Sequence, residues 1–454
     1  MVVGPSQAFA HASDRGHVLL LPTGYYVAGG ACAVAISFLV LLAVPDAALR
    51  RARPRGLFLA EIPAGLRVWT SCLSFTVLMM LVAAGVWGSR DPLSNPLPLT
   101  IWTLVWVGLT LIQGTIGNLW GWIGPWYGPA RILARLLPAP RRYPKLLGAW
   151  PSVALLLGFI WFELVDTAPD DPFRLATAVG GYWMFAFVGT LLFGHAAWSG
   201  RAEFLSVFFR LISAYSVVSG RREAARIRII AGPPDHKPEA GLALAPSETV
   251  FLLVALAAVS FDGFMRTFTW LGAIGVNPLE FPGRSALMLP NTLGLVAAIV
   301  ALTGLYLTCV AIGRSLADSA MAFWALAGRL VWSLVPIALA FHAAHYLVAL
   351  LVNGQYALVA LSDPFALGWN LFGTAGWPVA AGIAMGSASA WLLWNVQAGV
   401  IVLGHVAAVL VCHAACMDIH ADRRKAMLAE LPLTVLMVGY TVFGLWLLST
   451  PTGA

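Results

Sequence analysis

Two histidines stand one helical turn apart in an otherwise apolar stretch, FHAAHYLVALL, at residues 341–351. Imidazole and carboxylate groups bind transition metals, and imidazole also exchanges protons near neutral pH. Ionisable side chains inside long apolar segments are costly, so they usually face a cavity, a ligand or another polar group. The candidates of this kind along the chain are Glu163, Asp262, His342, His345, His405 and His413.

The composition places these residues in a membrane-spanning chain. Hydrophobic residues make up 60% and charged residues 10% of the 454 positions, whereas soluble domains contain about 25% charged residues. A spanning helix needs roughly 20 mostly apolar residues. The sequence therefore predicts an all-α, polytopic transmembrane helix bundle of about ten spans, forming a single membrane domain over residues 1–454. The predicted spans lie near residues 24–45, 68–89, 98–122, 147–165, 175–198, 249–271, 290–313, 329–352, 391–416 and 431–449.

The basic residues orient these spans. Alternate connections hold 21 of the 27 lysine and arginine residues, and the positive-inside rule places such connections in the cytoplasm. Both termini are then expected outside. The net charge of +7 follows from this topology, so no nucleic-acid partner is needed to explain it. The partner that the composition requires is the lipid bilayer.

Three segments outside the predicted spans are long enough to form structure of their own. Residues 1–23 are expected to form an uncleaved outer tail; cleavage after the AFA at residues 8–10 would instead expose His11 as a copper-binding end group. Residues 199–248 form a predicted cytoplasmic loop whose start, RAEFLSVFFRLI, has the spacing of an amphipathic helix on the inner membrane surface. Residues 353–390, rich in glycine and aromatic residues, are expected to form an outer re-entrant or lid loop.

Depth in the membrane groups four of the candidates. At about 1.5 Å per helical residue, Asp262, His342, His345 and His405 fall within a slab several ångströms thick, and His413 lies about 12 Å deeper. Four interpretations remain open at this point: separately packed histidines, a metal centre, one haem, and a proton or ion pathway.

Two local patterns bear on these interpretations. Arg266 follows Asp262 at the four-residue spacing of an ion pair, so a structural role explains this carboxylate as well as ligation does. Cys412, Cys416 and His420 share one helix face, and thiolate with imidazole suits zinc or cuprous copper. One straight helix spreads these three over about 12 Å, which is too far for a single ion.

Several stretches, taken in order, form a distinctive set that covers nearly the whole chain. They are AFAHASDRGHVLLLPTGYYVAGGACAVAISFLV, AWPSVALLLGFIWFELV, FGHAAWSGRAEFLSVFFRLI, SFDGFMRTFTW, LVPIALAFHAAHYL, SDPFALGWNLFGT, VQAGVIVLGHVAAVLVCH and VGYTVFGLWLLS. As a set they resemble a bacterial multi-pass membrane family labelled fenitrothion hydrolase. The resemblance implies an organophosphorus triester hydrolase of the bacterial inner membrane, with periplasmic termini. The resemblance also implies that His342 stands at a position where the family varies and that Cys412 replaces the alanine usual in the family.

The resemblance also implies a site. A divalent transition metal (zinc, copper, iron or manganese) would activate water for attack on the phosphorus of a small apolar substrate that enters from the lipid side. The expected metal ligands are His345, His405, Asp262 and His342, the last being alternatively a pocket-lining residue. His413 is expected to act as a deeper ligand or proton acceptor, and Asp363 as a lid residue or partner of a ligand. The alternative is a transport or redox subunit that binds a metal or haem b, without hydrolysis, and works with a membrane or periplasmic protein partner.

Overall fold

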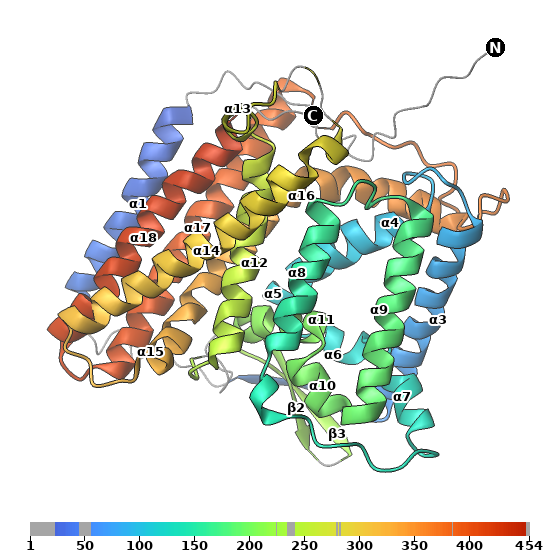
Figure 1. Ribbon diagram of the computed structural model, residues 1–454, viewed down its shortest axis with the longest axis horizontal. Helices are drawn as coiled ribbons and strands as arrows, with labels where there is room; N and C mark the ends of the chain where they lie inside the picture. The colour runs from blue at the N-terminus through green and yellow to red at the C-terminus, as the bar shows by residue number, and fades with distance from the viewer. Residues whose placement is uncertain are drawn as a thin grey trace.

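The computed structural model describes residues 23–44, 56–223, 225–233, 241–277, 280, 283–383 and 385–450. Within these ranges the chain is mostly helical and has one small sheet (Figure 1). The expectations for the outer tail up to residue 22, including His11, lie outside the described residues, as do the arginines of residues 45–55.

Among the described residues, nine helices are long and apolar enough to cross a membrane. They are α1 (Thr23–Ala43), α3 (Leu66–Trp87), the continuous α4, η1 and α5 (Pro96–Thr115), α9 (Pro172–Phe193), α12 (Pro246–Met265), α14 (Arg284–Leu316), the continuous α15, η6 and α16 (Phe323–Ser362), α17 (Ser387–Ile419) and α18 (Arg423–Ser449). Each overlaps one predicted span. The remaining predicted span, at 147–165, is α8 (Trp150–Leu164), an apolar helix of 15 residues. Because a crossing needs roughly 20 residues, the tenth span stays a prediction.

The helices form a wide bundle with α12 and α16 near its centre (Figure 1). On one side, α17 and α18 pack together and against α1, while α14 packs along α18 and α12. On the other side, η1 (Leu99–Leu109) packs along α16, α8 along α12, and α3 against α9. Arg423, which begins α18, donates to the carbonyls of Leu41 and Leu42 at the end of α1. The two helices are therefore antiparallel, and the start of α1 lies at the same end of the bundle as the end of α18.

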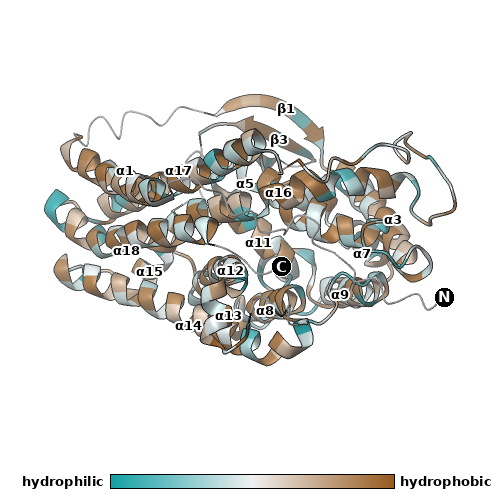
Figure 2. Cartoon of the chain, turned by 90° about the horizontal axis from the view of Figure 1, so that it is seen from above, coloured by the Kyte–Doolittle hydropathy of each residue, from teal (hydrophilic) through white to brown (hydrophobic). Residues whose placement is uncertain are grey.

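Apolar residues, brown in Figure 2, make up much of the helices, and many of their side chains lie on the outside of the bundle. Examples of large apolar side chains with more than half of their surface exposed are Leu39, Leu73, Leu293, Leu403 and Val435. Soluble monomers rarely expose apolar surface of this extent. This surface therefore fits contact with lipid.

The segment at 199–248 contains more than the single helix expected there. Its helix, α11 (Phe204–Ile212), is present, but Val207, Phe209 and Leu211 are fully buried. This corrects the expectation of a surface helix, because the apolar face of α11 packs on α5 (Thr110–Thr115) and α8 rather than on lipid. The chain then forms β2 (Val218–Glu223) and β3 (Arg226–Ala231), which join β1 (Leu57–Pro63) in an antiparallel sheet of order β1-β3-β2.

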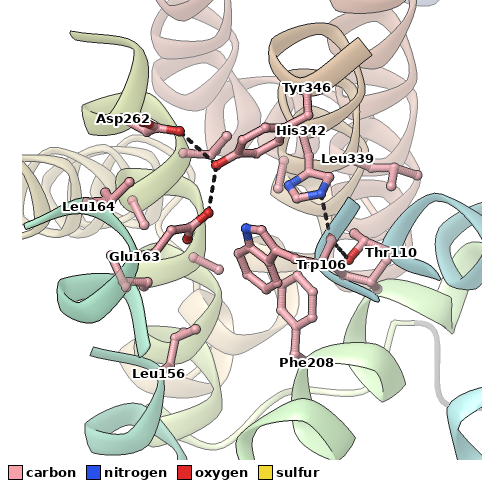
Figure 3. A pocket seen from close by; sticks show the side chains of 16 residues that line it. Trp106, Thr110, Leu156, Glu163, Leu164, Phe208, Asp262, Leu339, His342 and Tyr346 are labelled. Carbon is pink, nitrogen blue, oxygen red and sulfur yellow. Dashed lines mark hydrogen bonds between the residues drawn. The ribbon is translucent and has the colours of Figure 1, made fainter. Parts of the chain in front are cut away.

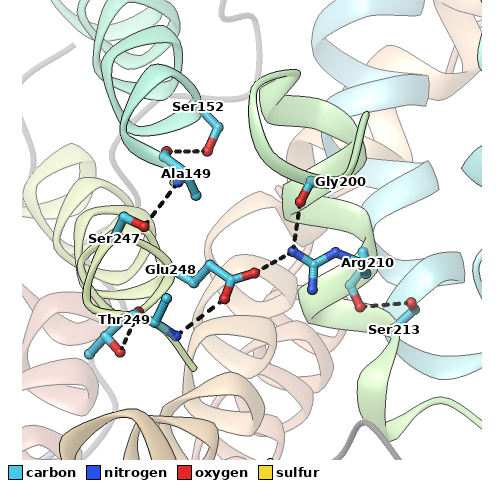
Figure 4. Close-up of polar contacts among 9 residues, drawn as sticks. Ala149, Ser152, Gly200, Arg210, Ser213, Ser247, Glu248 and Thr249 are labelled. Carbon is cyan, nitrogen blue, oxygen red and sulfur yellow. Dashed lines mark hydrogen bonds and ion pairs between the residues drawn. The ribbon is translucent and has the colours of Figure 1, made fainter. Parts of the chain in front are cut away.

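An ion pair fixes α11 to the bundle (Figure 4). Arg210 Nη2 lies 2.6 Å from Glu248 Oε1 in the first turn of α12 and 3.3 Å from the carbonyl of Gly200. Next to this pair, the Ser247 hydroxyl accepts the backbone N–H of Ala149, at 3.0 Å, just before α8. The starts of α8 and α12 are thereby held together and to α11, and side chains from all three helices line the cavity described below.

The outer loop predicted at 353–390 is shorter than expected. Helix α16 (Leu334–Ser362) continues through residues 353–362, and the non-helical segment begins only at Asp363. This segment exposes Leu367, Trp369 and Phe372. Exposed apolar side chains of this size fit contact with lipid or with another apolar surface, and the lid role stays a prediction.

Candidate functional site

Asp262, near the end of α12, is the centre of a buried polar network. Its side chain is 1% exposed, and both of its oxygens have partners. Arg266 Nη2 lies 3.1 Å from Oδ1, whereas His345 Nε2 and the Tyr346 hydroxyl lie 2.8 and 2.7 Å from Oδ2. The ion pair that the spacing of Asp262 and Arg266 offered as an alternative to ligation is present. It coexists with a contact to His345 on α16.

The Tyr346 hydroxyl links Asp262 to a second carboxylate (Figure 3). It lies 3.2 Å from Oε1 of Glu163, which comes from the last turn of α8. Three helices, α8, α12 and α16, therefore each supply polar side chains to one continuous network. Burial of a carboxylate is costly unless it is paired and hydrogen-bonded, and here each carboxylate has at least one such partner.

A small cavity of about 30 Å³ lies beside this network (Figure 3). Asp262, Glu163 and Tyr346 line it, together with apolar side chains that include Leu156 and Phe208. On the same measure of cavity volume, one buried water molecule needs roughly 10–15 Å³, so the cavity has room for about two water molecules. Drug-sized ligands occupy pockets of about 300–1,000 Å³, so this cavity does not hold an aryl phosphotriester or a haem.

His342 also lines the cavity, but its ring is committed to the backbone. Its Nε2 lies 2.9 Å from the carbonyl oxygen of Trp106, which also accepts the Thr110 hydroxyl at 2.5 Å. Trp106 belongs to η1, a π-helix, and such irregular helical turns frequently occur at functional sites. With Nε2 donating to this carbonyl, His342 packs against η1, which agrees with the pocket-lining alternative for this residue.

His405 lies away from the network although its predicted depth is similar. Its side chain is fully buried, and Nδ1 lies 2.8 Å from the carbonyl of Ile401 on its own helix. Its ring neighbours are Phe341 and Tyr440, with centroids 6.0 and 6.3 Å away. Depth alone therefore grouped His405 with Asp262 and His345, although the ring of His405 packs against a different set of side chains.

His413 belongs to a separate cluster near the cytoplasmic end predicted for α17. Nδ1 lies 2.9 and 3.1 Å from the two oxygens of Glu430, a fully buried residue of α18. Ligand atoms of Cys412, Cys416 and Glu430 all lie within 4.8 Å of one another. Within the described parts of the chain, this is the group of three or more histidine, cysteine or acidic residues arranged closely enough to hold one metal ion.

The predicted ligand set of His345, His405, Asp262 and His342 does not fit a single metal ion. Only His345 and Asp262 come into contact, and Nε2 of His345 is occupied by that contact. His342 and His405 direct one ring nitrogen each to a backbone carbonyl. We therefore derive no metal chemistry from these four residues.

Asp363 is placed at the end of α16, outside the network. Its two carboxylate oxygens accept the backbone N–H groups of Leu367 and Gly368 at 2.9 and 2.8 Å. Desolvation acts to raise the pKa of Asp363, but the hydrogen bonds from these N–H groups and that of Trp369 outweigh it and hold the pKa below its ordinary value. Asp363 thus shapes the turn that follows α16.

Three residues of these clusters had no assigned role in the sequence interpretation. Glu163 was recognised as an intramembrane carboxylate, but no partner was assigned to it from the sequence. Tyr346 was not singled out, because the interpretation concentrated on the histidine that precedes it. Glu430 was placed in a loop because it follows the basic run Arg423–Lys425, whereas α18 in fact begins at Arg423. The aspartate at 422, which caps this helix by accepting the backbone N–H of Arg424, was the available signal.

Comparisons with protein-family models, with curated proteins and with solved structures found no match. The fold class that the described residues define is a helical, membrane-compatible bundle with a buried carboxylate network. The resemblance to the fenitrothion hydrolase family stays a prediction.

Proposed function

We propose that this chain is an integral membrane protein that transfers protons through Glu163, Tyr346, Asp262 and His345. The observation that supports the proposal most strongly is the position of the Tyr346 hydroxyl, which contacts two carboxylates at once. A hydroxyl has a single proton to donate. It therefore donates to one carboxylate and accepts a hydrogen bond from the other only when that other carboxylate is protonated.

Two proton arrangements satisfy both contacts. In the first, Glu163 carries a proton and donates it toward the tyrosine oxygen, while Tyr346 donates to Asp262. In the second, Asp262 carries the proton and Tyr346 donates to Glu163. Conversion of the first arrangement into the second moves one proton from Glu163 to Asp262 and leaves Tyr346 neutral in both states.

Each carboxylate of this pair lies next to a group or a space that can exchange a proton with it. At one end, the His345 side chain is 24% exposed and contacts Asp262 through Nε2, while Nδ1 has no hydrogen-bond partner among the described residues. At the other end, Glu163 borders the cavity that has room for water. Arg266 balances the charge of Asp262 when that carboxylate is ionised.

Replacing Tyr346 by phenylalanine is expected to slow proton flux about 100-fold, the lower end of what a positioned proton-transfer group contributes. Phenylalanine keeps the ring but removes the hydroxyl that joins the two carboxylates. Flux is measured with purified protein in vesicles that contain a pH-sensitive dye, under a potassium diffusion potential set with valinomycin.

Asp166→Asn is the matched control for this experiment. Asp166 is a buried carboxylate that follows α8 and pairs with Arg174 at 2.7 Å, but it is not part of the network. This variant should conduct like the wild type. A wild-type flux equal to that of protein-free vesicles, or a Tyr346→Phe flux equal to the wild-type value, would overturn the proposal.

A second candidate function, hydrolysis of an apolar phosphotriester, is supported by the pairing of His345 with Asp262. A carboxylate that holds Nε2 of a histidine leaves Nδ1 to accept a proton from an attacking water, which is general-base chemistry. The cavity is too small for such a substrate, so the substrate would have to approach the partly exposed side of His345.

His345→Gln is expected to lower any such hydrolysis by about 100-fold, because glutamine cannot accept the proton. The assay is release of nitrophenol from a nitrophenyl phosphotriester by detergent-purified protein, with and without a chelator. Asp166→Asn again serves as the control. Absence of nitrophenol release by the wild-type protein would remove this function and leave the proton-transfer proposal untouched.

The finer topology is also part of the proposal. With α8 as a short tenth span, both termini lie in the periplasm of a bacterial inner membrane. The basic connections support this orientation, and the start of α1 and the end of α18 at one end of the bundle fit an even number of spans.

A further inference from the structure

The cluster around Glu430 lies apart from the Asp262 network and contains an unusual buried carboxyl group. Glu430 is fully buried, and among the described residues the one side-chain hydrogen-bond partner of its carboxyl group is Nδ1 of His413. A buried carboxylate costs free energy unless a positive group or several hydrogen bonds compensate it. A neutral imidazole gives this carboxylate a single donor, so Glu430 can accept a cation on the side that His413 does not cover.

Two thiols lie close to this carboxyl group. Cys412 and Cys416 are both fully buried and stand one turn apart on α17, so their sulfurs share one helix face. The Glu430 carboxylate reaches them from α18, with all three ligand atoms within 4.8 Å of one another. Two thiolates bound to tetrahedral zinc at about 2.3 Å lie roughly 3.8 Å apart, so small side-chain rotations close this arrangement around an ion.

Two further polar atoms at the cluster have no hydrogen-bond partner among the described residues. Nε2 of His413 is buried without one, and the ring itself is 2% exposed. The hydroxyl of Thr434, one turn from Glu430 on the same helix, is likewise buried and unpaired. Buried polar atoms without partners are rare in folded proteins and often mark an unseen water or ion.

We propose that Cys412, Cys416 and Glu430 form a binding site for zinc, oriented by the hydrogen bond from His413 to Glu430. Two thiolates and a carboxylate suit zinc, and a ligating carboxylate is commonly held by a hydrogen bond from a neighbouring side chain. The second helix resolves the difficulty raised by the sequence, in which Cys412, Cys416 and His420 extended too far along one helix. This site is independent of the proton-transfer proposal, because it shares no residue with the Asp262 network.

The site is tested with full-length protein purified under a reducing agent, stripped of metal and titrated with Co²⁺, which reports thiolate ligands by their charge-transfer absorption. We expect one Co²⁺ per chain, displaced by one Zn²⁺. Cys416→Ser should abolish the thiolate band. His413→Gln should retain the band and weaken binding about 10- to 100-fold, as expected for a group that orients a ligand.

Cys309→Ser is the matched control, because Cys309 is also a buried thiol, on α14, but is not one of the three ligands. It should bind Co²⁺ like the wild type. The zinc content per chain of wild-type protein after Zn²⁺ loading and removal of excess metal, read by elemental analysis, keeps the test valid if a variant fails to fold. No thiolate band in the wild type, an undiminished band in Cys416→Ser, or no zinc retained by the wild type would each overturn the proposal.

Discussion

Replacing Arg266 by alanine is expected to lower the free energy of unfolding by about 3 kcal/mol, the lower end of the range for breaking a buried ion pair. Asp262 is 1% exposed, and Arg266 lies 3.1 Å from its Oδ1. Removal of the guanidinium leaves a buried carboxylate that retains hydrogen bonds from His345 and Tyr346 but loses its permanent positive partner. The measurement is equilibrium unfolding in mixed detergent micelles, followed by tryptophan fluorescence.

A double-mutant cycle separates the charge effect from lost packing. Asp262→Asn combined with Arg266→Ala should be less destabilised than the sum of the two single variants, because the neutral amide needs no positive partner. Arg226→Ala is the control, since the Arg226 and Glu61 side chains of its ion pair are 68% and 38% exposed. Exposed pairs contribute up to about 1 kcal/mol. Equal losses of stability in Arg226→Ala and Arg266→Ala would show that burial of Asp262 does not matter.

The sequence was informative about position along the membrane normal. Apolar run length and helical rise predicted that Asp262 and His345 share a depth, and the two side chains are in contact. The same calculation grouped His405 with them, yet His405 packs near Phe341 and Tyr440. Depth gives the position of a residue along its helix. The helix face on which the residue lies, and the helix that this face contacts, depend on how the helices rotate and pack, which the apolar pattern of one sequence does not reveal.

The sequence did not predict the elements whose residue pattern is weak in a membrane protein. Strand β1 has the sequence LFLAEIP and is almost wholly exposed on both faces, so it lacks the alternation of a half-buried strand. Its pairing with β3 joins segments more than 150 residues apart, which local pattern does not reveal. Glu430 was missed for a related reason, because eight helical residues rich in charge precede the apolar part of α18.

Close packing of α14 on α18 makes Gly313 a position where a single added methyl group should be damaging. A Cβ at Gly313 would overlap the backbone carbonyl of Ala429, and backbone cannot move aside as a flexible side chain can. Small residues let helices approach closely in membranes. Gly313→Ala should therefore lower the free energy of unfolding by about 1–3 kcal/mol, the usual cost of overpacking, as measured by the same unfolding assay.

Gly304→Ala is the matched control on the same helix, because a Cβ there meets no atom within 4 Å. It should stabilise the protein slightly, since alanine is favoured over glycine inside a helix by roughly 1 kcal/mol. The two variants add the same methyl group, so their difference isolates the contact with α18. Because Ala429 directly precedes Glu430, displacement of α18 in Gly313→Ala should also weaken Co²⁺ binding at Cys412 and Cys416. Equal stability and equal Co²⁺ affinity in the two variants would show that this helix contact does not position the cluster.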